Sequence, residues 1–296
     1  MLKIKMGNLE NINSAVKLLS DQVSVGSLSH CNQKGDPYPS GEELSKIVDL
    51  CYAIFFPGFF GDNTSVNSDT IQYHIGVNVE KLYIKLSEQL YAGMCFDPEN
   101  DKCGGDLKQE AQAMASEFVG TLPGIREILS TDVEAIFRGD PAAKNYGEII
   151  LAYPGLKAIV NYRIAHSLLL LGANPLIPRM ITEKAHSLTG IDIHPGATIG
   201  RYFAIDHGTG IVIGETTIIG ENVKLYQGVT LGARSFPADE NNIIIKGILR
   251  HPIIEDNVVI YAGATILGRV TIGHDSVVGA NTWVTTDLPA GSKVTI

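Results

Sequence analysis

The carboxy-terminal part of the chain repeats an aliphatic residue at every sixth position. From residue 254 onward these positions are Ile254, Ile260, Ile266, Ile272, Val278 and Val284. The same spacing occurs earlier at Ile193, Ile199 and Ile205 and, after two extra residues, at Ile213, Ile219, Leu225 and Leu231. Helices repeat every 3.6 residues and half-buried strands every two, so a spacing of six fits neither element. It is typical of a parallel β-helix, in which three hexapeptides form one triangular coil of about 18 residues.

Residues 1–187 instead carry helical patterns. Residues 74–94 place apolar side chains on one helical stripe, and residues 156–171 are mostly apolar before Gly172. Ser40 and Thr131 each begin a sequence typical of a capped helix start. We therefore predict an α+β protein with two domains. An all-α helical domain covers residues 1–187, and a left-handed parallel β-helix of hexapeptide repeats covers residues 188–296.

Composition and charge narrow the classes of function. Hydrophobic residues make up 45% of the chain and charged residues 19%, which excludes a disordered protein. The net charge of −9 argues against nucleic acid or an anionic membrane as a partner, because both require a basic surface. The sequence has neither a membrane-spanning apolar run nor the apolar stretch of a signal peptide. We expect a cytoplasmic protein in which Cys95 and Cys103 are free thiols.

Candidate chemistry lies where polar residues interrupt the six-residue spacing. The spacing fails between Leu231 and Ile254, which predicts a long loop, and rigid scaffolds commonly carry function on loops.

Neighbours in a strand point to opposite faces, so Asp206 and His207 are not expected to act on each other. Asp192 precedes His207 by 15 positions, a little under one coil, and is the expected carboxylate partner. A carboxylate that holds one imidazole nitrogen leaves the other free as a general base. The alternative is a corner histidine with a structural role.

Several segments resemble the serine O-acetyltransferases, a family of hexapeptide-repeat acyltransferases. The segments begin at Asp132, Asp140, Tyr162, Asp192, Ile205, Gln227 and Arg250, and read DVEAI, DPA, YRIAH, DIHPGATIG, IDHGTGIVIGET, QGVTLG and RHP. They follow the order that the family uses and cover about residues 120–285. Other hexapeptide acyltransferases share the spacing but not this combination.

The resemblance implies transfer of an acetyl group from acetyl-CoA to the hydroxyl of L-serine, which gives O-acetyl-L-serine for cysteine biosynthesis. It implies that His207 is the general base and that Asp192 is its orienting carboxylate. It also implies that Asp132 and Asp206 bind the amino and hydroxyl end of serine, and that Arg250 and His251 bind its carboxylate. The acetyl-CoA groove would be lined by Gly232, Ala262 and Gly263. These roles suit the chemistry, because a zwitterionic substrate needs one anionic and one cationic subsite. No metal is expected.

The resemblance also implies a homo-oligomer, either a trimer or a dimer of trimers. Active sites would then lie between subunits, with Arg250 and His251 supplied across the interface. Relatives bind O-acetylserine sulfhydrylase through a terminal isoleucine. This chain also ends in isoleucine, Ile296, but with only a short reach beyond the last coil.

Three alternatives remain open at the level of sequence. The first is a hexapeptide acetyltransferase with another hydroxyl acceptor, such as homoserine or a sugar. The second is a metalloenzyme like the γ-carbonic anhydrases, in which His194, His207 and His251 would have to converge on one metal. The third is a non-catalytic scaffold, which neither acetyl-CoA nor serine would stabilise against heat.

Overall fold

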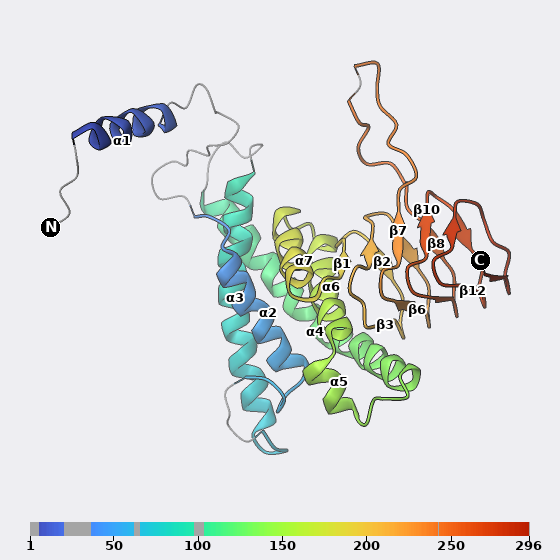
Figure 1. Ribbon diagram of the computed structural model, residues 1–296. Coiled ribbons are helices and arrows are strands. Elements are labelled where there is room, and N and C mark those ends of the chain that lie inside the picture. The colour runs from blue at the N-terminus through green and yellow to red at the C-terminus, as the bar shows by residue number, and fades with distance from the viewer. Residues whose placement is uncertain (1–5, 21–36, 62–65, 98–103, 242, 296) are drawn as a thin grey trace. The chain divides into compact units, whose positions relative to one another are not determined.

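The computed structural model describes residues 6–20, 37–61, 66–97, 104–241 and 243–295. The chain divides into two compact units, Met1–Asp36 and Pro37–Ile296. The described part of the first unit is helix α1 (Met6–Leu19), whose Leu9, Ile12 and Val16 are exposed. The second unit contains the remaining helices and every described strand (Figure 1).

The first part of the second unit contains six helices in its described residues. They are α2 (Gly41–Phe55), α3 (Ile71–Phe96), α4 (Gly105–Gly139), α5 (Tyr146–Ala152), α6 (Pro154–Leu170) and α7 (Leu176–Thr189). The predicted cap at Ser40 is confirmed, because its side chain accepts a hydrogen bond from the Glu43 backbone over 3.3 Å. The predicted helix start at Thr131 is wrong. This residue lies inside α4, where its hydroxyl donates to the carbonyl of Ile128 over 2.7 Å.

The second part of this unit is a parallel β-helix of short strands. The strands are β1 (Asp192–Ile193), β2 (Thr198–Ile199), β3 (Ala204–Asp206), β4 (Val212–Ile213), β5 (Ile218–Ile219), β6 (Lys224–Tyr226), β7 (Thr230–Gly232), β8 (Ile253–Ile254), β9 (Val259–Ile260), β10 (Thr265–Leu267), β11 (Thr271–Ile272), β12 (Val277–Val278), β13 (Trp283–Val284) and β14 (Lys293–Val294). They form three parallel sheets. The first sheet is β1-β4-β7-β10-β13, the second is β2-β5-β8-β11, and the third is β3-β6-β9-β12-β14. The chain runs through the three sheets in turn, so each circuit is one coil.

The side chains that set the six-residue spacing form the core of the β-helix. Ile193, Ile213, Leu231, Ile266 and Val284 lie in register on successive strands of the first sheet. All thirteen aliphatic residues of the predicted spacing are buried, with exposed fractions from 0 to 6%. Because these side chains stack on those of the neighbouring coils, they are removed from water. This burial of apolar surface is the main contribution to the stability of the β-helix. The predicted fold class is confirmed.

The helical part and the β-helix share one hydrophobic core. Helix α6 packs so closely on β3 that a β-carbon at Gly155 would lie 2.5 Å from the carbonyl oxygen of Ile205. The buried Tyr162 hydroxyl donates to the Ala197 carbonyl over 2.6 Å. The first coil is therefore fixed by the helices. A domain boundary between residues 187 and 188 stays a prediction.

Two further expectations concern thiols and membranes. Cys95 is disulfide-bonded, so the prediction of a free thiol there is wrong. Cys103 lies outside the described residues. Cys51 is a buried free thiol, and burial raises its pKa. None of the described helices is both long enough and apolar enough to cross a membrane.

Candidate active site

Several of the predicted site residues lie along two edges of the β-helix. The turns that join the third sheet to the first form the His207 edge, which carries His207 between β3 and β4 and Ala262 and Gly263 between β9 and β10. The turns that join the first sheet to the second form the Arg250 edge, which carries Arg250 and His251 directly before β8. Within one chain the first sheet separates these two groups.

His207 lies at the turn that interrupts the six-residue spacing. Eight positions, not six, separate Ile205 from Ile213, and the extra residues form a turn in which His207 has a φ of 57° and Gly208 one of 90°. A histidine adopts this left-handed conformation more readily than most residues do. The turn leaves the His207 side chain 77% exposed. The imidazole therefore lies at the surface, on a turn between two strands whose inward-facing Ile205 and Ile213 are buried.

Among the described residues, the carboxylate nearest to the His207 ring is that of Asp206. Its Oδ1 lies 3.7 Å from His207 Nε2. The expectation that these neighbours point apart is wrong, because β3 ends at Asp206 and His207 has already left the extended conformation. Asp192 lies on β1 with a half-buried side chain, and no hydrogen bond joins it to His207 among the described residues.

A second carboxylate, Asp140, lies beside Asp206. The two side chains line one small cleft together with Tyr153 and Lys224. Asp140 follows the last residue of α4, and its Oδ2 accepts a hydrogen bond from the Tyr153 hydroxyl over 2.6 Å. This bond lowers the pKa of Asp140 and raises the pKa of Tyr153 to about 12. Asp140 therefore stays charged near neutral pH, next to Asp206.

Asp132 lies elsewhere, inside the junction between the helices and the β-helix. Its side chain is 0% exposed, and its two oxygens accept hydrogen bonds from Arg163 over 3.0 and 3.1 Å. Its Oδ1 also accepts from the backbone of Phe203 over 3.0 Å. Both oxygens are thus occupied within the chain, and none of its surface is left for a ligand.

The Arg250 edge combines a guanidinium with a neutral imidazole. Arg250 pairs with Glu215 over 2.8 Å. The Nδ1 of His251 accepts from the backbone N–H of Thr216 over 3.0 Å, so its proton resides on Nε2. Burial, and then the charge of Arg250, lower the pKa of His251 to about 4. Near neutral pH the two neighbours therefore differ, because Arg250 is a charged guanidinium and His251 is an uncharged imidazole.

Glycines line the His207 edge over several coils. Gly228 and Gly263 have φ values of 73° and 71°, and the backbone N–H of Gly263 donates to the carbonyl of Gln227 over 2.9 Å. Ala262 and Gly263 therefore lie on the same edge as His207, and a lack of side chains keeps the backbone there accessible. Gly232 lies at the opposite border of the first sheet, where its carbonyl accepts from Gly268 over 3.0 Å.

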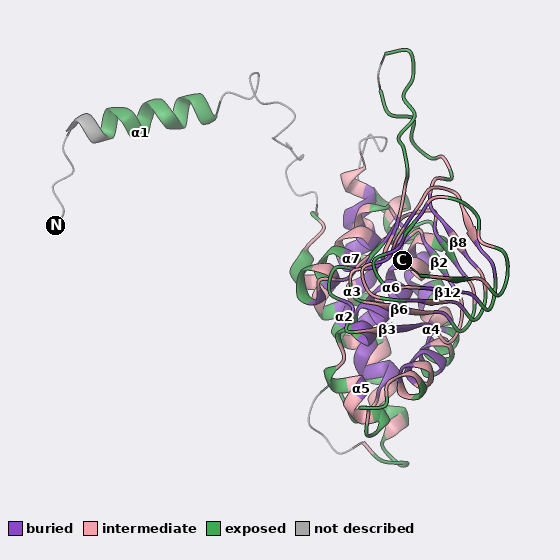
Figure 2. Ribbon diagram, turned by 45° about the vertical axis from the view of Figure 1, so that its right-hand side comes forward, coloured by how far each residue is buried: buried purple, intermediate pink, exposed green. Residues whose placement is uncertain are grey.

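The predicted loop between Leu231 and Ile254 projects from the Arg250 edge and is exposed over most of its length (Figure 2). It forms an irregular hairpin that is bridged between Ala238 and Ile244. Its large exposed apolar side chains are Phe236, Ile243, Ile244, Ile245 and Leu249.

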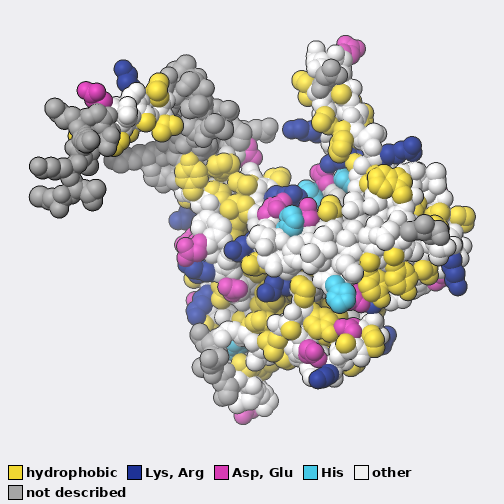
Figure 3. Space-filling model, in the orientation of Figure 1, with side chains coloured by type: hydrophobic (Ala, Val, Ile, Leu, Met, Phe, Trp, Pro, Cys, Tyr) yellow, Lys and Arg dark blue, Asp and Glu magenta, His cyan; other side chains and the backbone are white. Residues whose placement is uncertain are grey.

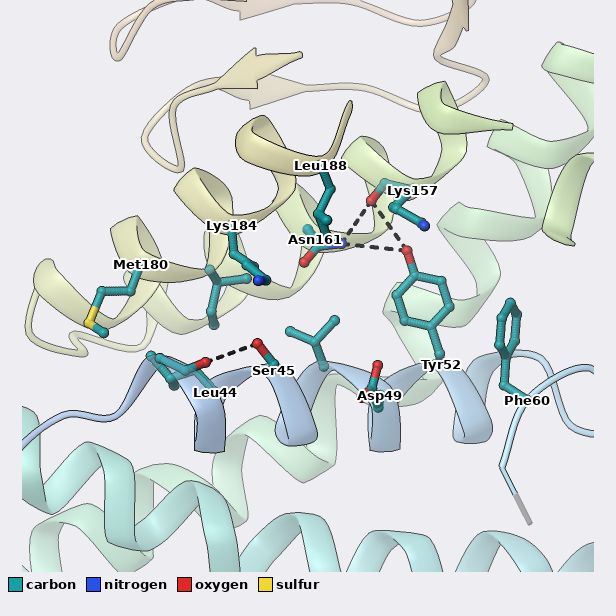
Figure 4. Close-up of a pocket in the computed structure, with 13 residues that line it drawn as sticks. Leu44, Ser45, Asp49, Tyr52, Phe60, Lys157, Asn161, Met180, Lys184 and Leu188 are labelled. Atoms are coloured by element: carbon teal, nitrogen blue, oxygen red, sulfur yellow. Dashed lines mark hydrogen bonds between the residues drawn. The ribbon is translucent and has the colours of Figure 1, made fainter. Parts of the chain in front are cut away.

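Two other features lie apart from these residues. A cavity of about 380 Å³ between α2, α6 and α7 is lined by Leu44, Tyr52 and Asn161 but by none of the predicted site residues (Figure 4). The one described group of side chains that could hold a metal is Glu183, His186 and Asp192. It lies where α7 meets the first coil, and Figure 3 shows histidine and charged side chains gathered in this region. It includes none of the three histidines that a carbonic-anhydrase-like site would need.

Comparison with known proteins gives consistent matches. The family model described as bacterial transferase hexapeptide (six repeats) matches residues 251–286. The plasmid serine acetyltransferase of Synechococcus elongatus is 45% identical over 289 residues, which are 96% of this chain and 90% of that protein. The serine acetyltransferase of Bacillus subtilis is 46% identical over 167 residues, which are 56% of this chain and 72% of that protein.

Solved structures extend the similarity to the fold. Serine acetyltransferase 1 of Entamoeba histolytica, solved in complex with L-cysteine, superposes with a TM-score of 0.74 at 35% identity. That match covers 97% of this chain and 100% of the other. Soybean serine acetyltransferase, solved in complex with serine, gives a TM-score of 0.54 at 29% identity and covers 85% of this chain and 95% of the other.

Proposed function

Because the chain belongs to the serine acetyltransferase family of acyltransferases, we propose that it transfers the acetyl group of acetyl-CoA to the hydroxyl of L-serine. The observation that carries the proposal is an exposed imidazole, His207, at a turn of the β-helix, beside Asp206 at the end of β3, which shares a small cleft with Asp140 from the end of α4. This grouping provides a base and an amine-binding site at the same place.

His207 acts as the general base. The serine hydroxyl is a poor nucleophile until a base removes its proton as the oxygen attacks the thioester carbonyl. His207 takes that proton while the new oxygen–carbon bond forms. The carbon–sulfur bond then breaks, and the proton passes from His207 to the departing CoA thiolate. Asp206, 3.7 Å from the ring, stabilises the imidazolium that exists between these steps. The orienting role of Asp192, on β1, rests on the family resemblance and stays a proposal.

The ammonium group of serine binds between Asp140 and Asp206. These carboxylates lie in one cleft next to His207, whereas Asp132 is enclosed within the protein. Asp140 therefore takes the substrate-binding role that the sequence resemblance gave to Asp132. Asp132 holds the framework of the site through Arg163.

The carboxylate of serine binds to Arg250 and His251 of a neighbouring subunit. One chain holds these residues on the edge opposite His207, so a second copy has to bring the two edges together. This division favours a homo-oligomer, and the family resemblance implies that it is a trimer or a dimer of trimers. Acetyl-CoA extends from His207 along the glycines of the same edge toward Ala262 and Gly263. Gly232 lies at the border of the Arg250 edge, so it would reach this groove from the neighbouring subunit.

The acceptor is tested by mixing the protein with acetyl-CoA and following free thiol. We expect release of CoA with L-serine and at least about ten-fold lower kcat/KM with L-homoserine or a galactoside, because neither fits both charged subsites at serine length. Preference for homoserine or a galactoside would contradict the proposal. A stoichiometric metal in the purified protein, together with hydration of CO₂, would favour the carbonic-anhydrase-like alternative.

A glycine substitution tests the role of His251. A β-carbon at Gly214 would lie 2.1 Å from the His251 ring, so the Gly214→Ala variant must displace the ring. We expect the KM for L-serine to rise about ten-fold with a smaller change in the KM for acetyl-CoA. Gly120→Ala is the matched control, because a β-carbon there meets nothing within 4 Å. Equal KM values for L-serine in the two variants would remove His251 from the substrate site.

Two expectations stay predictions. Binding of O-acetylserine sulfhydrylase depends on Ile296, which lies outside the described residues. The cytoplasmic location rests on the sequence alone.

A further inference from the structure

One lysine joins the end of helix α4 to the strand that carries Asp206. Lys224 lies on β6, and its Nζ is 2.8 Å from Asp206 Oδ2. The same Nζ donates to the carbonyl oxygen of Gly139, the last residue of α4, over 2.7 Å. The ammonium also lies 4.5 Å from the centroid of the Tyr226 ring. The Lys224 side chain is only 16% exposed, so all three interactions form in a place that is largely shielded from water.

The contacts of Lys224 position both carboxylates of the proposed amine site, Asp206 and Asp140. Lys224 holds one oxygen of Asp206 directly, which leaves Oδ1 as the oxygen that faces His207. It also fixes the backbone of Gly139, the residue immediately before Asp140. All three charged side chains line the same cleft. The lysine therefore sets the distance between a carboxylate of the helical part and one of the β-helix.

The charges in the cleft are matched to one ammonium group. Asp140 and Asp206 contribute two negative charges and Lys224 one positive charge, which leaves a single negative charge for a ligand. Without the lysine, the two carboxylates would repel each other, and the carbonyl of Gly139 would lose its donor.

We propose that Lys224 is a positioning residue that holds Asp140 and Asp206 around the ammonium group of the acceptor. Lys224 thereby makes recognition of the acceptor depend on its ammonium group. The inference rests on the proposed function, since the acceptor is taken to be L-serine. It predicts that loss of Lys224 weakens recognition of the amine more than it affects acetyl-CoA.

The test compares L-serine with 3-hydroxypropionate, which keeps the hydroxyl and the carboxylate but lacks the ammonium. For Lys224→Met we expect the ratio of their kcat/KM values to fall about ten-fold, mainly through a higher KM for L-serine. The KM for acetyl-CoA should change by less than about two-fold. Lys224→Arg, which keeps the charge and the donors, should restore most of the ratio. Lys293→Met is the matched control, because Lys293 is an exposed lysine on β14 of the same sheet.

An unchanged ratio in Lys224→Met would overturn the inference even if L-serine is a good substrate. A lower KM for L-serine in that variant would overturn it as well, since Lys224 would then compete with the ammonium. Calorimetric titration of the protein with each acceptor measures binding without turnover, so it tests Lys224 independently of the acetyl transfer. If the wild-type protein binds L-serine without acetylating it, the proposed function fails, but the same ten-fold loss of binding preference still supports Lys224. If it binds neither acceptor, both proposals are overturned.

Discussion

Replacement of His207 by asparagine is expected to lower kcat by about 10²–10⁴-fold, the usual contribution of a general base. Asparagine suits this position because the residue has a φ of 57°, which asparagine tolerates and alanine does not. A His207→Ala variant would add backbone strain to the loss of the imidazole. The asparagine variant therefore separates the chemistry from the fold. Steady-state release of CoA with saturating acetyl-CoA and L-serine measures the effect.

His274→Ala is the matched control for this substitution. His274 is also an exposed histidine at a turn of the β-helix, and its Nδ1 pairs with the neighbouring Asp275 over 2.7 Å. It lies after β11, on neither of the edges that carry the proposed site. Its variant should keep nearly full turnover. If His207→Asn retained more than about a tenth of the wild-type kcat, another group would have to accept the serine proton.

The sequence was sufficient to predict the β-helix because its core consists of the same contact repeated between successive coils. Each coil places the same kind of side chain at the same point, so the spacing of Ile254, Ile260 and Ile266 directly describes the stack. The break in spacing between Ile205 and Ile213 also marked the turn of His207. A regular repeat thus reveals its functional turn as an irregularity. The arrangement of neighbouring subunits, in contrast, produces no such irregularity in the six-residue spacing.

The amine site was harder to predict because it depends on where a helix ends in space. The sequence at Thr131 resembles a helix cap, yet the burial of the surrounding α4 residues in the core continues the helix to Gly139. Asp132 is therefore turned into the interior, and Asp140, eight residues later, reaches the cleft. An acidic residue directly after a helix, followed by proline, was the available signal for Asp140. Its nearness to Asp206 depends on tertiary contacts such as that of Lys224.

The buried pair of Asp132 and Arg163 leads to the second large expected effect. Asp132→Ala should lower the free energy of unfolding by about 3–5 kcal/mol, because it leaves the Arg163 guanidinium, 6% exposed, without its counter-charge. Arg163 also donates to the carbonyls of Ile199 and Gly200 over 2.7 and 2.6 Å. The loss should therefore loosen the first coil against the helices. Urea unfolding at one fixed protein concentration measures it, since an oligomer is stabilised by mass action.

A double variant separates the cost of an unpaired charge from the value of the pair. Asp132→Leu combined with Arg163→Met removes both charges, and we expect it to be more stable than Asp132→Ala, because apolar residues can replace a buried ion pair at little cost. Recovery should be incomplete, since the carbonyls of Ile199 and Gly200 lose their donor. Glu127→Ala is the control on the same helix. Its exposed pair with Arg201 should leave the stability close to that of the wild type. An Asp132→Ala variant with wild-type stability and a raised KM for L-serine would return Asp132 to the substrate site and displace Asp140 from it.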